Sequence, residues 1–147
     1  MKSRPFALLL VAFMFISVTS FAQSANYKQP MTINANGQVK DASGATIGLV
    51  TKDKIIQDAQ GKKIAFVDGQ GNLVDAKTGK KMGRIGKDGK TYCNAEGELL
   101  FTIKDNADNT CDIFDSKGKK IGNVHDSYKG TACALHCFQN QHAHLTK

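Results

Sequence analysis

The chain has 147 residues with a formal net charge of +7 at pH 7, 14 glycines, two prolines and no tryptophan. This composition favours short strands with glycine turns over helices, and the length suits one domain with a single core. No segment beyond the N-terminal hydrophobic run approaches the length needed to span a membrane.

Residues 1–22 have the pattern of an export signal. Lys2 and Arg4 form a basic end, a hydrophobic run follows, and Ser20-Phe21-Ala22 is a small-x-small cleavage site. We therefore predict cleavage near Ala22 and a periplasmic or secreted mature chain without a membrane span, the alternative being an uncleaved anchor. Without Lys2 and Arg4, 18 basic residues stand against 13 acidic ones, so the net charge becomes about +5. Residues 23–30 are predicted to form a polar N-terminal arm.

A short pattern then occurs five times, with turn glycines spaced 17, 18, 18 and 21 residues apart. This period is too short for a strand-helix-strand unit, so each copy is predicted to be one β-hairpin. Asp or Asn can begin a type I turn, and the later glycine accepts the left-handed conformation that ends it. The predicted structural turn residues are Asp41 and Gly44, Asp58 and Gly61, Asp75 and Gly79, Asn94 and Gly97, and Asp115 and Gly118.

Apolar residues keep phase with these turns, two residues before each Asp or Asn and three and six residues after each glycine. A flat strand repeats its face every second residue, so a spacing of three does not fit it. The intervening position is Gly48, Ala65, Gly83, Phe101 or Gly122, and its small size in four copies indicates a bulge, a bend or a close backbone approach.

Both ends of the repeat region resemble half of a unit. Residues 31–33 match the second strand of a hairpin, and residues 131–135 are predicted to form the first strand of another. If the two pieces meet, they close the sheet and remove its exposed edges. The predicted division is therefore a repeat domain at residues 31–138 and a polar, histidine-containing tail at residues 139–147.

The spacing Asp-x-x-Gly-x-x-Ile-Gly-x-Val, in five copies behind a signal peptide, resembles the bacterial five-fold β-flower family. The similarity covers residues 31 to about 130, with Asn94 and Phe101 as departures in the fourth copy. The resemblance implies an exported all-β domain of five hairpins in a closed or near-closed five-fold ring. It implies no catalytic or cofactor-binding residue, because no established activity of the family is known to us.

Four cysteines make an even set, so disulfides are permitted in an exported chain. In a simple meander Cys93 and Cys111 are separated by one intervening strand, which is too far for a bridge without a strong bend. Cys111 and Cys133 meet the same difficulty, and the choice between paired and free thiols stays open. The set of candidate disulfide cysteines is Cys93, Cys111, Cys133 and Cys137.

The C-terminal segment also holds thiol and imidazole groups that suit zinc or copper. On a helix, three of these residues would share one face, but their spacing matches no standard zinc signature. A closing strand and a solvated tail with a disulfide are the favoured interpretation, and no cofactor is expected. The candidate ligands of the less favoured metal site are Cys133, His136, Cys137, His142 and His144.

No serine-hydrolase, zinc-protease, phosphate-loop or dinucleotide motif is present, so we expect a protein that is not an enzyme. Lysine pairs follow three turn glycines, which predicts either soluble hairpin tips or attraction of an anionic glycan or protein of the cell envelope. No aromatic residues are interleaved with them, so nucleic acid is not expected. The predicted function is a binding or structural module, and the alternative is a periplasmic metal-handling or redox protein. The pairs are Lys62-Lys63, Lys80-Lys81 and Lys119-Lys120.

Overall fold

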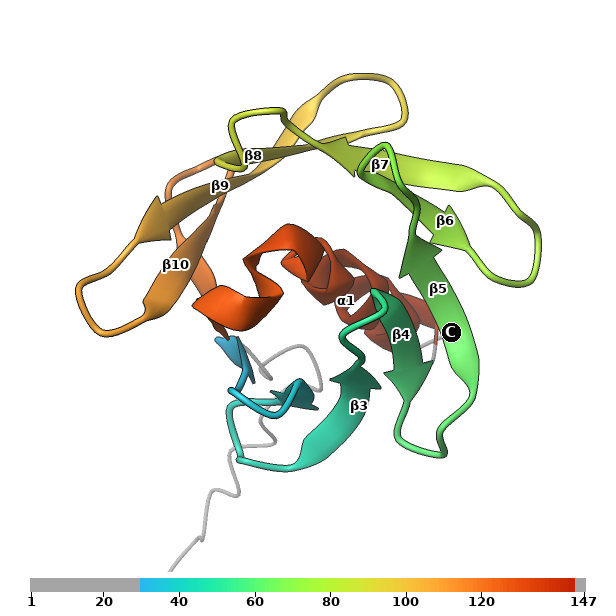
Figure 1. Ribbon diagram of the computed structural model, residues 1–147, viewed down its shortest axis with the longest axis horizontal. Helices are drawn as coiled ribbons and strands as arrows, with labels where there is room; N and C mark the ends of the chain where they lie inside the picture. The colour runs from blue at the N-terminus through green and yellow to red at the C-terminus, as the bar shows by residue number, and fades with distance from the viewer. Residues whose placement is uncertain (1–29, 145–147) are drawn as a thin grey trace, which may run out of the picture.

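Alternating short strands and tight turns build a closed all-β barrel of eleven strands in the computed structural model, which describes residues 30–144 (Figure 1). The predicted signal peptide and residues 23–29 of the predicted arm lie outside the described residues. The first six strands are β1 (Met31–Ile33), β2 (Gln38–Lys40), β3 (Thr46–Val50), β4 (Ile55–Asp58), β5 (Lys63–Val67) and β6 (Asn72–Asp75). The others are β7 (Lys81–Ile85), β8 (Thr91–Asn94), β9 (Leu99–Asp105), β10 (Thr110–Asp115) and β11 (Lys120–His125).

Neighbouring strands in the chain pair antiparallel, and one parallel pair closes the barrel. There β1 lies beside β11, with Met31 opposite Gly122 and Ile33 opposite Val124. This pairing leaves no open edge in the described sheet, which protects it from pairing with another chain. The N-terminal piece therefore takes part in closure, but its partner is β11 and not residues 131–135.

The prediction of a strand at residues 131–135 is wrong. The 3-10 helix η1 (Asp126–Thr131) follows β11, and the α-helix α1 (Ala134–His144) comes next. Since β1 already completes the barrel, a further strand has no edge to join, whereas the apolar side chains of this segment can fill the interior. The helix also crosses the predicted boundary at residue 138, so part of the predicted tail continues α1.

Every repeated hairpin contains one β-bulge, which confirms the bulge expected from the apolar spacing. In the first copy Val39 pairs with Gly48 and Lys40 pairs with Thr46, so Ile47 has no partner in the ladder. The extra residue shifts the strand by one position and turns Gly48 and Val50 towards the interior. The bulged residues are Ile47, Ile64, Met82, Leu100 and Ile121.

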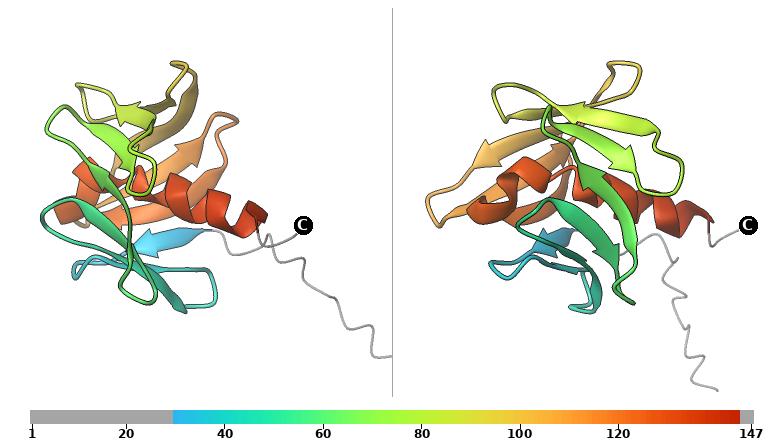
Figure 2. Two further views of the ribbon diagram at one scale, coloured as in Figure 1. Left: turned by 90° about the vertical axis from the view of Figure 1, so that its right-hand side faces the viewer. Right: turned by 45° about the vertical axis from the view of Figure 1, so that its right-hand side comes forward.

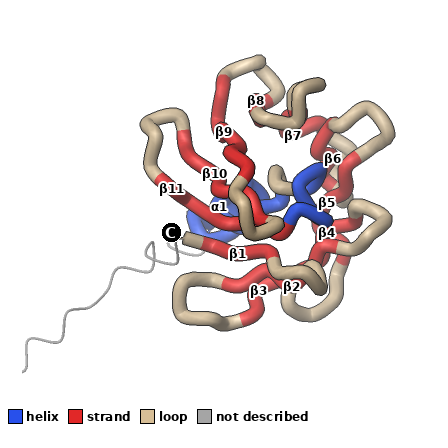
Figure 3. The backbone as a smooth tube through the Cα atoms, turned by 60° about the vertical axis from the view of Figure 1, so that its left-hand side comes forward, coloured by secondary structure: helices blue, strands red, loops and turns tan. Residues whose placement is uncertain are grey.

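The helix α1 lies inside the barrel and emerges at one end, as the turned views in Figures 2 and 3 show. Leu135 and Phe138 are 0% and 1% exposed and belong to the single buried cluster with the inward strand residues. Small residues make room for them. A Cβ atom at Gly48 would lie 2.5 Å from Cε1 of Phe138, and one at Gly122 would lie 2.5 Å from Cδ1 of Leu135. In the first and fifth copies the small position of the repeat thus makes room for the helix.

Among residues 30–144, neither helix has the length and apolar character required to cross a membrane.

Candidate functional site

The repeated Asp and Asn residues hold the hairpin turns together. In the second copy, Oδ1 of Asp58 accepts hydrogen bonds from the backbone N–H groups of Gln60 and Lys62, both at 2.9 Å. The N–H of Gly61 donates to the carbonyl oxygen of Asp58 at 3.1 Å, and Gly61 has a φ of 81°. A carboxylate that is engaged in this way serves the turn and is poorly placed for acid–base chemistry. The first, fourth and fifth copies make equivalent bonds with Asp41 and Gly44, Asn94 and Gly97, and Asp115 and Gly118. In the third copy, whose turn is one residue longer, Oδ1 of Asp75 accepts from the backbone N–H groups of Lys77 and Thr78, and the N–H of Gly79 donates to the carbonyl oxygen of Asp75.

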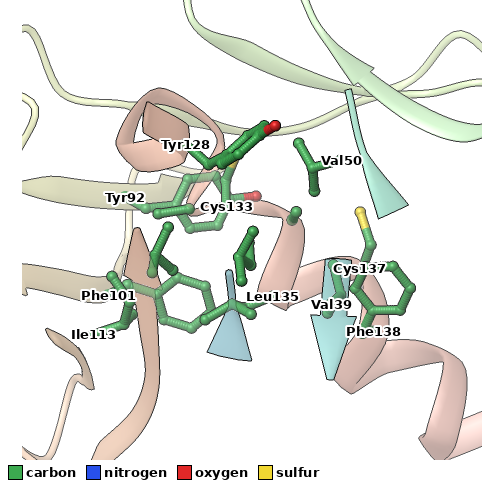
Figure 4. Close-up of a cluster of buried hydrophobic side chains, with 14 of the residues drawn as sticks. Val39, Val50, Tyr92, Phe101, Ile113, Tyr128, Cys133, Leu135, Cys137 and Phe138 are labelled. Carbon is green, nitrogen blue, oxygen red and sulfur yellow. The ribbon is translucent and has the colours of Figure 1, made fainter. Parts of the chain in front are cut away.

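The barrel interior contains one aromatic cluster at the fourth copy. Tyr92 and Phe101 are directly paired on β8 and β9, and their ring centroids are 5.3 Å apart. The ring of His136, from α1, approaches both edge-on at 5.5 Å and 6.2 Å. Gly83 on β7 makes room for Tyr92, since a Cβ there would lie 2.5 Å from Cζ of the tyrosine. Figure 4 shows Tyr92 and Phe101 beside Cys133 and Leu135.

A hydrogen bond of 2.8 Å joins the Tyr92 hydroxyl to Nδ1 of His136. Burial raises the pKa of Tyr92 well above its ordinary value and lowers the pKa of His136. The tyrosine therefore keeps its proton and the imidazole is neutral near pH 7, so the hydroxyl can donate to Nδ1. Tyr92 is buried and His136 is half-buried, and their hydrogen bond links α1 to β8.

All four cysteines are free thiols in the structure. Cys93 is half-buried, whereas Cys111 faces the interior with 0% exposure and its thiol donates to the carbonyl oxygen of Val124 at 3.4 Å. Burial raises the pKa of Cys111 to about 11 and that of Cys137 to about 12, and it raises the pKa of Cys133 further. These three thiols are therefore protonated at neutral pH, which makes them poor nucleophiles.

The structure places Cys133 immediately before α1, and His136 and Cys137 within it. The described residues contain no cluster of three or more His, Cys, Asp or Glu side chains in an arrangement that could hold a metal ion. His142 and His144 belong to α1 by their backbone, and their side chains lie outside the described part of the structure.

The outer face of the barrel presents the lysine pairs that follow the hairpin turns. Lys62, Lys80 and Lys119 are exposed, and so are the lysines that follow each of them. Two of these have specific partners: Lys63 lies 4.4 Å above the ring of Phe66, and Nζ of Lys120 is 2.9 Å from Oδ1 of Asp112. In Figure 1 the hairpin turns lie at the periphery with α1 at the centre, so these charges are spread around the rim.

A surface cavity of about 480 Å³ lies over β7 and β8. Its lining includes Lys81, Arg84 and Lys87 with the half-buried Cys93. Lys81 was singled out from the sequence as one of the paired lysines and Cys93 as a candidate disulfide cysteine, whereas Arg84 and Lys87 were not. One signal was present, because Arg4 and Arg84 are the only arginines in the chain and Arg4 belongs to the predicted leader. The Tyr92–His136 bond, between residues 44 positions apart, had no sequence signal of its own.

Comparisons with known proteins found no matching family model, no matching curated protein and no matching solved structure.

Proposed function

We propose that the mature chain is an exported, non-enzymatic binding module of the cell envelope, whose partner is an anionic glycan or an acidic protein surface. The observation that carries this proposal is the division between the interior and the rim. The Asp and Asn side chains of the repeats are bound within their own turns, the Tyr and Cys groups of the interior are buried, and the half-buried His136 is bonded to Tyr92. The exposed groups that recur are lysines.

Recurrent cations on a rigid rim suit a polymer with repeated negative charges. Each lysine contributes little alone, but several sites on one body bind one polymer together and raise the overall affinity. The five bulged hairpins also support the finer interpretation that they form a five-fold ring like that of the β-flower family. In such a ring the lysine pairs would occupy equivalent places in the second, third and fifth copies.

Retention on immobilised alginate, an acidic polysaccharide, tests this function against retention on neutral dextran. We expect the mature protein to be retained on alginate and released by salt, because salt screens exposed charges. The variant Lys62→Gln/Lys80→Gln/Lys119→Gln should elute at a clearly lower salt concentration. Equal retention on alginate and dextran, or unchanged elution of the triple variant, would refute the proposal.

The unfolding midpoint of the triple variant provides the control. The three lysine side chains are exposed, so their replacement should leave stability within about 0.5 kcal/mol of the parent. Loss of retention with unchanged stability assigns the effect to the surface charge.

A further inference from the structure

The cavity over β7 and β8 is formed by side chains that share the outer face of the sheet. Arg84 pairs with Asn72 on β6 and with Cys93 on β8, so the three residues lie side by side across three strands. Tyr92, the neighbour of Cys93, faces the interior, which places Cys93 on the outside. The volume of about 480 Å³ falls within the range of about 300–1,000 Å³ that is usual for sites of small molecules.

The charge of this cavity is entirely positive. Lys81 and Arg84 come from β7 and Lys87 from the turn that follows it, while no aspartate or glutamate belongs to the lining. Within residues 30–144, none of these three cations forms an ion pair with a carboxylate. The lining itself carries three positive charges and no negative one, and the carboxylate of Asp68, outside the lining, interacts electrostatically with Lys81. The net positive charge favours the entry of an anion.

The other polar lining residues are held by the protein itself. Nδ2 of Asn72 donates to both carboxylate oxygens of Asp68, at 3.2 Å and 3.0 Å. Nδ2 of Asn94 donates to Oε2 of Glu98 at 2.9 Å, and Oδ1 of Asn94 accepts from two backbone N–H groups. These bonds fix the walls and leave the guanidinium of Arg84 as the group with several donors available for a ligand.

Arginine at this position is distinctive within the chain. The mature region contains lysine at every other basic position, and its single arginine lies in this cavity. A guanidinium presents a planar fork that matches a carboxylate or a phosphate group with two parallel hydrogen bonds, which an ammonium group cannot do. Ile85, Ala95 and the backbone of Gly86 add uncharged surface for the rest of a ligand.

We propose that this cavity binds a small organic anion, with its carboxylate or phosphate group on Arg84 and its uncharged body against Ile85 and Ala95. Lys81 and Lys87 add long-range attraction at the entrance. This inference rests on the proposed function, because both place binding on the outer face of the barrel. It adds one discrete site on that face for the acidic group of a sugar or a similar molecule.

Chemical-shift titration of the mature protein tests the site with four probes: glucose 6-phosphate, glucuronate, inorganic phosphate and glucose. The two sugar anions should shift the backbone amide signals of Arg84 and Cys93 in a saturable way. Inorganic phosphate should bind more weakly because it lacks the sugar ring that contacts the uncharged surface, and glucose should cause no shift because it lacks the acidic group. If only one sugar anion binds, the head group is identified as phosphate or carboxylate.

Charge variants separate a discrete site from a diffuse field. Arg84→Gln should weaken binding at least about tenfold, while Arg84→Lys, which keeps the charge and loses the fork, should weaken it by about threefold. Lys117→Gln removes one exposed positive charge from a turn outside the cavity and should leave affinity within about twofold. Lys87→Gln provides a second cavity variant if Arg84→Gln does not fold.

The proposal fails if no anion shifts these signals, or if Lys117→Gln weakens binding as much as Arg84→Gln. These results are distinguishable from failure of the proposed function, because the triple lysine variant used on alginate leaves all three cavity cations in place. A protein that ignores alginate and still binds glucose 6-phosphate through Arg84 would retain this site and lose the broader function.

Discussion

The close contact between Gly48 on β3 and Phe138 on α1 gives a sharp prediction for Gly48→Ala. The new methyl group would lie 2.5 Å from Cε1 of Phe138 and 2.6 Å from the carbonyl oxygen of Gln57. The backbone oxygen cannot move without disturbing the pairing of β4, and Phe138 is 1% exposed. Overpacking of this kind costs about 1–3 kcal/mol, while replacing glycine in a strand returns about 0.5–1 kcal/mol. The difference of these ranges runs from about 0 to 2.5 kcal/mol, and we expect a loss near its middle, about 1 kcal/mol.

Urea unfolding followed by circular dichroism measures this loss, since the chain has no tryptophan. Gly69→Ala is the matched control, because a Cβ atom at Gly69 meets nothing within 4 Å. Shortening the ring partner in Gly48→Ala/Phe138→Leu should give a loss smaller than the sum of the two single losses, since one of the two clashes is relieved. If Gly48→Ala is as stable as Gly69→Ala, the claim that Gly48 makes room for Phe138 of α1 is refuted.

Four further predictions follow from the interior and the turns. Tyr92→Phe should lower stability by about 1–2 kcal/mol in urea unfolding, because Nδ1 of His136 loses its partner; no loss would contradict the role of this bond. Burial lowers the pKa of His136, so the unfolded chain takes up this proton first and stability should fall as the pH drops below about 6.5. That slope should flatten in His136→Gln, and an unchanged slope would assign the effect to other groups. Lys54→Gly should raise stability by about 0.5 kcal/mol, because Lys54 has a φ of 64° where three of the other turns between copies have Gly37, Gly71 and Gly89; a loss would show that the lysine side chain compensates for the strain. Iodoacetamide followed by mass spectrometry should modify Cys93 alone in the native protein, since the other three thiols are buried; rapid modification of a second thiol would contradict this packing.

The repeat pattern predicted much of the sheet because the fold depends on local geometry that each copy encodes for itself. The Asp–Gly spacing gave the turn positions, and the apolar spacing of three residues predicted the bulge that the ladder now shows at Ile47 and its equivalents. The inward positions were only partly identified. The bulged residues are half-buried except Ile121, whereas the small residues beside them are the ones that face the interior.

The helix could not be predicted from the repeats because it belongs to none of them. Residues 131–135 resemble a strand by composition, and their local preference is overridden by a barrel that is already closed by β1. The space beside Gly48 and Gly122, which Phe138 and Leu135 of α1 occupy, was the signal that the sequence offered. In the fourth copy Tyr92 and Phe101 replace smaller residues together, and this joint departure marks the place where the imidazole of His136 packs.

The candidate binding surface was predicted only in its lysine pairs. Those pairs recur in phase with the turns, so the sequence alone places them at the hairpin tips. The cavity needs the register of β6, β7 and β8, which brings Asn72, Arg84 and Cys93 together from three strands. The register cannot be read from the sequence, where Arg84 stands out only because arginine is rare in this chain.

The central claim is that the exposed lysines at the hairpin tips bind an anionic polymer, whereas the barrel interior only supports the structure. Hydrogen exchange of the mature protein with and without alginate oligomers tests this claim. Added protection should appear in the lysine-bearing tips, residues 59–63, 77–81 and 117–120, with no change in residues 134–139 of α1. Protection concentrated in α1 and around Tyr92, with unchanged exchange at the tips, would contradict the account.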